Sequence, residues 1–87
     1  MKITIKEVEN YLKTEKKDLL KVLEREYEWA TPEELIKDTI SKCFGVIMFM
    51  SEYSNIKLDE LDALWDEYHM IFRALLISYQ NKKENKK

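Results

Sequence analysis

The most regular hydrophobic pattern in this chain lies between residues 58 and 79. Apolar and aromatic residues recur there at alternating spacings of three and four, at Leu58, Leu61, Trp65, Tyr68, Phe72, Leu75 and Tyr79. Because a helix returns to the same face every 3.6 residues, this spacing predicts a helix with one narrow apolar seam. We expect that helix to run from about Lys57 to about Asn81. The seam requires a partner surface, which the preceding part of the chain must supply.

The segment Thr31-Pro32-Glu33-Glu34 predicts the start of a second helix. Pro at the first helical position loses no hydrogen bond, Thr31 caps the backbone, and Glu34 completes a capping box. Ser54 and Asn55 are expected to end this helix, because Asn tolerates the left-handed conformation that closes many helices. The connection to the final helix is then short, so the last two helices are predicted to form an antiparallel hairpin.

Residues 4–29 contain a further apolar face but leave the number of helices open. Thr4 and Glu7 fit a capping box, although the branched residues around Thr4 also permit a short β segment. The polar stretch from Thr14 to Asp18 interrupts the apolar pattern without a Gly or Pro. Two interpretations therefore stay open: one long helix, or two short helices with Thr14 ending the first.

Composition favours an all-helical protein. The 87 residues include one Gly and one Pro, too few for the turns of a sheet protein, while charged residues, mostly Lys and Glu, make up 37%. We predict an all-α fold, an antiparallel bundle of three to four helices with the C-terminal hairpin as its core. One helical domain is expected at residues 1–80, followed by a disordered Lys/Asn-rich tail at residues 81–87.

The last two predicted helices carry more apolar residues than one small core accommodates. Hydrophobic residues are 45% of a chain whose length buries only about 60–65% of its unfolded surface. The run from Cys43 to Met50 is apolar on all sides, and from Met70 to Ile77 only Arg73 is polar. Gly45 is best explained by close approach of another helix, with a loose turn as the alternative. We therefore predict a homo-oligomer, with a dimer favoured. Its candidate interface residues are Phe44, Ile47, Met48, Met70, Ala74 and Ile77.

One small cluster has the spacing of metal ligands. Asp62, Asp66 and His69 stand at spacings of four and three, and Asp66-x-x-His69 resembles the acidic-x-x-His pairs that, with two further carboxylates, hold a di-metal centre in helical bundles. Such a centre needs two of these pairs, and the chain has a single His, so a solvated acidic face is the simpler interpretation. Cys43 has no group placed to activate it and is expected to be a small buried hydrophobe. We predict no metal, cofactor or enzyme activity.

The distribution of charged residues bears on whether the chain binds nucleic acid. Lys13, Lys17, Lys21 and Arg25 form a row at spacing four on a continuous helix, which would suit a small regulatory or nucleic-acid-associated accessory protein. Glutamates three or four positions away partly neutralise the row. The net charge is −2, with +3 in residues 81–87 and therefore −5 in the rest, which disfavours binding to phosphates.

The leading expectation is a non-enzymatic helical protein–protein interaction module. An immunity-type helical bundle is an alternative that shares only size, lysine content and helical class with this chain. The longest apolar run has eight residues, against about 20 needed to span a bilayer, and one cysteine gives no support to an oxidising compartment. We expect a cytoplasmic protein with no membrane segment.

Overall fold

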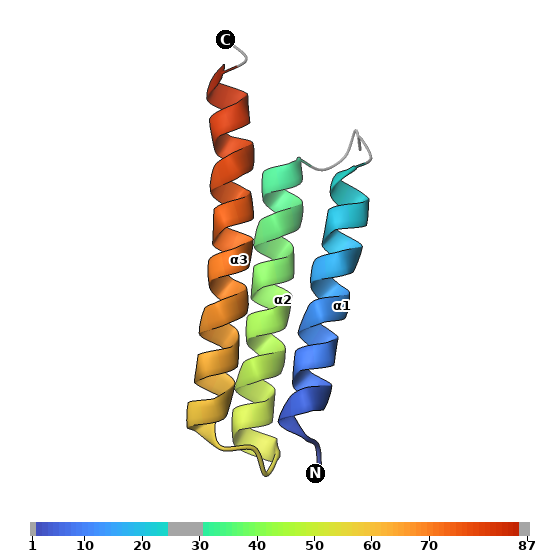
Figure 1. Cartoon of the computed structure of the whole chain (residues 1–87), viewed down its shortest axis with the longest axis vertical. Helices are drawn as coiled ribbons and strands as arrows, with labels where there is room; N and C mark the ends of the chain where they lie inside the picture. The colour runs from blue at the N-terminus through green and yellow to red at the C-terminus, as the bar shows by residue number, and fades with distance from the viewer. Residues whose placement is uncertain (1, 25–30, 86–87) are drawn as a thin grey trace.

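Three helices lie side by side, and successive helices run in opposite directions (Figure 1). The computed structural model describes residues 2–24 and 31–85, with side chains for residues 2–24 and 31–81. Its helices are α1 (Ile5–Leu23), α2 (Pro32–Tyr53) and α3 (Leu58–Asn85). The all-helical prediction is confirmed, and the described part of the chain contains three helices rather than four.

The helix starts follow the predicted caps. The hydroxyl of Thr31 accepts a hydrogen bond from the Glu34 amide at 3.2 Å, and the Glu34 carboxylate accepts one from the Thr31 amide at 3.5 Å, so the capping box that opens α2 is confirmed. Thr4 likewise accepts from the Glu7 amide at 3.2 Å. The Glu7 carboxylate, however, accepts from the Thr4 hydroxyl at 3.3 Å rather than reaching back to the backbone. No strand forms at Thr4, which has extended backbone geometry as the N-cap of α1.

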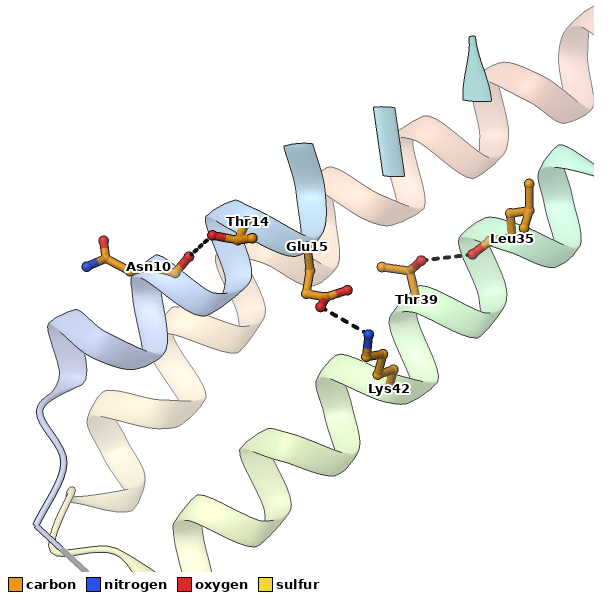
Figure 2. A network of polar contacts seen from close by, with 6 residues as sticks. All are labelled: Asn10, Thr14, Glu15, Leu35, Thr39 and Lys42. Carbon is orange, nitrogen blue, oxygen red and sulfur yellow. Dashed lines mark hydrogen bonds and ion pairs between the residues drawn. The ribbon is translucent and has the colours of Figure 1, made fainter. Parts of the chain in front are cut away.

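The first segment forms one continuous helix through the polar stretch. The Thr14 hydroxyl donates to the Asn10 carbonyl at 2.9 Å, so Thr14 satisfies itself inside the helix instead of capping a new one (Figure 2). Lys and Glu, which dominate this stretch, are good helix formers. α1 ends at Leu23, with Glu24 as its C-cap, earlier than the end near Trp29 that the sequence predicts; residues 25–30 lie outside the described part of the chain.

The turn between α2 and α3 differs from the predicted closure. Ser54 caps α2 in an extended conformation, and its hydroxyl and amide both donate to the Met50 carbonyl, at 2.6 and 3.0 Å. The predicted left-handed conformation of Asn55 is wrong, because no described residue has a positive φ. Asn55 instead accepts a hydrogen bond from the Ile3 amide at 3.2 Å, which ties the start of the chain to this turn.

The far end of α3 also differs from expectation. The helix continues to Asn85, past the predicted end near Asn81, because Lys and Glu favour helix and no Gly or Pro stops it. The division into a domain at residues 1–80 and a tail at residues 81–87 stays a prediction.

The core is built around the seam of α3, which packs mainly against α2. Leu61, Trp65, Tyr68 and Phe72 are buried, and α3 makes its most extensive contacts with α2. The other two helices supply an inward row each: Val8, Leu12 and Leu19 from α1, and Ile36, Cys43 and Ile47 from α2. Leu58 departs from the predicted seam and is 57% exposed, whereas Ile56, just before α3, is buried in the core.

Polar contacts between α1 and α2 lie at the edge of this core (Figure 2). Between the two helices, Nζ of Lys42 lies 3.1 Å from Oε1 of Glu15, whereas within α2 the Thr39 hydroxyl donates to the Leu35 carbonyl at 2.9 Å. Among the described residues no polar or charged side chain is buried, so packing rather than a buried polar network holds the helices together.

Cys43 is fully buried between α1 and α2, as predicted for a small hydrophobe. Burial raises the pKa of its thiol from the usual 9.0 to about 11, with a further rise from the Glu15 carboxylate and a partial offset from Lys42. A thiol with a raised pKa is protonated at neutral pH and is a poor nucleophile.

Replacing Phe72 by Ala should cost far more stability than the same change at Leu58. Both residues belong to the sequence-derived seam, but Phe72 is 0% exposed and Leu58 is largely exposed. Phe72→Ala is expected to lower the free energy of unfolding by about 3–5 kcal/mol, which removes most of the stability of so small a domain. Leu58→Ala should change it by less than about 0.5 kcal/mol. Urea denaturation followed by circular dichroism measures both, and equal losses would contradict the described core.

The buried thiol should make stability fall at alkaline pH. The folded-state pKa of Cys43 lies above its unfolded value, so its contribution is present below pH 9.0 and is lost as pH rises toward about 11. From about pH 8 to about pH 11, the wild type should lose on the order of 2–3 kcal/mol more than Cys43→Ala. Urea denaturation of both proteins across this range isolates the thiol, because other titrating groups are common to both. Parallel pH profiles would show that the thiol ionises freely in the folded state.

Candidate functional site

The candidate site is an exposed apolar surface on the outward side of α3. Met70 is 73% exposed and Ile77 is 51% exposed, with the exposed Ala74 between them. Spacings of four and three keep these residues on one face of the helix. Met70 lies two residues, about 200° of helix rotation, from the fully buried Phe72, so this stripe points away from the core.

A second apolar surface lies on α2, on the side that adjoins α3. Phe44 and Met48, four residues apart on α2, are each nearly half exposed. The ring of Phe44 lies 5.9 Å from that of Trp65, measured between centroids, which places this surface next to α3. Trp65 and Met70 are separated by about 140° around α3, so Phe44 and Met48 do not join the Met70 stripe. The structure therefore divides the predicted interface residues between two surfaces.

Ile47 does not belong to either surface. Its side chain is 3% exposed, four residues from Cys43 on the inward face of α2. The run from Cys43 to Met50 is apolar on all sides, but only one side of it faces the core. Ile47 is thus a core residue of the single chain, which corrects its selection as an interface candidate.

Gly45 is likewise explained differently. A Cβ atom built at Gly45 meets no atom within 4 Å outside its own helix turn, and the residue is exposed. The predicted close approach of another helix is therefore not made within this chain. Its φ angle is not positive, so no backbone strain requires a glycine here.

The predicted metal ligands are not gathered into a site. Asp62 and Asp66 are exposed on α3, and the ring of His69 stacks on Trp65 with centroids 5.2 Å apart and planes 8° apart. Within the described residues, no three His, Cys, Asp or Glu side chains are close enough to hold a metal ion. His69 packs against an aromatic neighbour instead.

The lysine row lies on the outer side of α1. Nζ of Lys13 forms an ion pair with Glu9 at 3.1 Å, while Lys17 and Lys21 are exposed; Arg25 lies outside the described residues. The hydrogen bond from Lys13 to Glu9 raises the pKa of Lys13, and the nearby Tyr68 and Glu67 of α3 add to the effect. Part of the row is therefore neutralised by its own chain.

A small groove between α1 and α2 was not predicted from the sequence. It has a volume of about 220 Å³ and is lined by Glu15, Asp18, Leu19, Val22, Leu35, Thr39 and Lys42. This is below the range of about 300–1,000 Å³ that is usual for small-molecule sites. Its only cation, Lys42, is held by Glu15, so the groove offers no convergent set of binding groups (Figure 2).

Replacing Gly45 by Ala should stabilise the protein. The added methyl group meets empty space, and Ala favours helix over Gly by about 0.5–1 kcal/mol. We expect a rise of this size in the free energy of unfolding, measured by urea denaturation under dilute conditions. A matched substitution at the exposed Ser41 of the same helix, Ser41→Ala, reports the gain from helix propensity alone. A loss of stability specific to Gly45→Ala would mean that another backbone approaches this position.

Across its described residues, the chain has no helix long and apolar enough to cross a membrane. Comparison of the chain with models of known protein families, with curated proteins and with solved structures finds no match. A functional proposal therefore rests on the surface that this fold exposes.

Proposed function

We propose that this protein is a non-enzymatic helical interaction module that self-associates through apolar surfaces of α2 and α3. The observation that carries the proposal is the outward stripe of α3, where Met70 is the most exposed large hydrophobic residue described. Single exposed hydrophobic residues are ordinary on protein surfaces. Apolar residues aligned at helical spacing on one face are a different feature, since such a face is typical of a helix that packs against a partner.

The energetics favour a weak, concentration-dependent association. Removing a Met or Ile side chain from water contributes about 1.5–3 kcal/mol when burial is complete. Met70 and Ile77 from two chains together supply at most about 6–12 kcal/mol. Association costs about 4–15 kcal/mol in lost translational and rotational freedom, so the balance is small. The surplus is therefore at most about 8 kcal/mol, which corresponds to a Kd no tighter than about 1 μM. We expect a dimer that forms only toward high micromolar concentrations and dissociates on dilution.

The chemistry of the described residues supports a role in binding rather than catalysis. Burial raises the pKa of Cys43, which is opposite to the shift that activates a nucleophile. The other described groups with raised pKa values are Tyr11, Lys13, Lys42 and Tyr68, which lie in the core boundary or in surface ion pairs. These groups do not converge on a cavity that could hold a substrate.

Placing a charge in the stripe should abolish self-association without unfolding the chain. Met70→Glu puts a carboxylate where the proposal buries an apolar side chain, and we expect at least about a tenfold loss of association, equal to 1.4 kcal/mol. Sedimentation equilibrium from low to high micromolar concentration measures this change. Leu20→Glu is the matched control, because Leu20 is an exposed apolar residue of α1 and should leave association unchanged. A wild-type protein that stays monomeric at high micromolar concentration would refute the proposal.

A further inference from the structure

We infer that α3 pairs with α3 of a second copy in antiparallel orientation, with Met70 on the twofold axis. This inference rests on the proposed self-association and specifies its geometry. It follows from three properties of the outward face of α3: its pattern of large and small residues, its pattern of charges, and the position of the other two helices. A twofold interface must complement itself, because the same face of each copy meets its equivalent.

On the outward face of α3, one small and one large residue lie at equal distances on either side of Met70. Ala63 lies seven residues before Met70, and Ile77 lies seven residues after it, so all three share one face two turns apart. Ala63, Met70 and Ile77 are all exposed. In an antiparallel pair centred on Met70, the large Ile77 of each copy lies over the small Ala63 of the other. Large residues facing small ones is the arrangement that lets two helices interdigitate.

The charges beside the stripe show the same complementarity. Asp66 lies four residues before Met70 and Arg73 three residues after it, and their separation of seven places them on one flank of α3. The twofold rotation of an antiparallel pair reverses the direction of the second helix. It leaves the same flank of both copies on one side of the interface. Arg73 of each copy therefore lies opposite Asp66 of the other. A parallel pair would instead place this flank opposite the other flank of the partner, so that Asp66 would face Glu67, a charge of the same sign.

The other helices leave this face of α3 open. α2 packs against the seam on the opposite side, around the buried Phe72. α1 also contacts α3, and its Lys13 interacts electrostatically with Glu67 and Tyr68, so α1 lies toward the flank of Glu67. The flank with Asp66 and Arg73 is on the other side of the stripe, where both residues are exposed. α3 is also the longest of the three described helices (Figure 1).

These properties favour a second copy over an unrelated partner. An unrelated partner would need no symmetry in the stripe, whereas here the size and charge patterns both complement themselves under the same rotation. An antiparallel pair is closed with respect to this surface, because each copy uses the same face of α3 and leaves no such face free for a third copy. The result is a dimer rather than a filament.

Disulfide trapping tests the geometry directly. In a Cys43→Ala background, which removes the only native thiol, Met70→Cys should form a disulfide-linked dimer on mild oxidation at associating concentrations. Ala63→Cys and Ile77→Cys should each fail alone, because equivalent positions then lie 14 residues, or about 21 Å, apart along the axis. A mixture of these two variants should give the mixed dimer, identified by mass. Lys17→Cys on α1 controls for random collision.

Each outcome is decisive. Cross-linking of Ala63→Cys or Ile77→Cys alone, at the rate of Met70→Cys, would mean a parallel pair and would overturn the inference. Failure of Met70→Cys to exceed the Lys17→Cys control would overturn it too. Sedimentation of the Cys43→Ala protein separates the two proposals: if it associates while these cross-links fail, the geometry is wrong and self-association stands. If it stays monomeric, the proposed function itself is wrong.

Charge reversal provides a readout that does not alter the apolar contact. Arg73→Glu should weaken association about tenfold, because two attractive pairs become repulsive. Adding Asp66→Arg to Arg73→Glu restores both pairs with reversed sign and should return association to within about twofold of wild type. A double variant no better than the single one would mean that Asp66 and Arg73 do not meet across the axis.

Discussion

The packing of the α3 seam against the inward row of α2 determines the rest of the structure. Phe72 and Leu61 of α3, and Ile36 and Cys43 of α2, are all fully shielded from water. Leu12 of α1, also fully buried, closes the third side. Once the rotation of α3 is fixed by Phe72, helix geometry places every other residue of α3, including the stripe that points outward. The exposure of Met70 is therefore a consequence of core packing and not an independent feature.

Three helices provide one shared interior, and this limits what the fold can bury. Each helix offers its neighbours one face and part of two flanks, so a helix that is apolar on two opposite faces cannot bury both within such a bundle. On α2 the surplus falls on Phe44 and Met48, and on α3 it falls on Met70 and Ile77. On α1 the outer side is instead rich in lysine, as expected of a helix whose only apolar contact is with the core. This difference in exposed apolar residues distinguishes α2 and α3 from α1 as the helices that offer apolar surface to a partner.

Features set by local interactions could be predicted from the sequence. The capping box at Thr31 and the central part of the α3 seam depend on neighbours within one or two turns, and both are found in the structure. Features set by tertiary geometry could not be predicted from the sequence. The segment around Ile47 is apolar on all sides, so periodicity does not reveal which side faces inward. Asn55 was assigned a local role in ending α2, whereas its side chain accepts a hydrogen bond from Ile3 at the other end of the chain.

The same distinction limits how the candidate site could be found. Alignment of Met70, Ala74 and Ile77 is a local property that the sequence displays, and the structure places these residues on one exposed face. The separation of this stripe from Phe44 and Met48 depends on how α2 and α3 are rotated against each other, and this rotation places the Phe44 ring beside Trp65. Gly45 gave a misleading signal, because a helix glycine has a packing explanation only if a neighbour approaches, and none does within the chain.

The charge pattern of α3 has a simpler explanation that applies to only part of it. Asp59 and Glu60 in the first turn stabilise the positive end of the helix dipole, so acidic residues there are expected of any helix. That effect decays within the first turn, however, and Asp66 and Arg73 lie well beyond it. Neither residue improves the dipole, and their separation of two turns places both beside the apolar stripe on the side away from α1. The helix dipole therefore does not explain Asp66 and Arg73. Their position beside the apolar stripe is the better explanation.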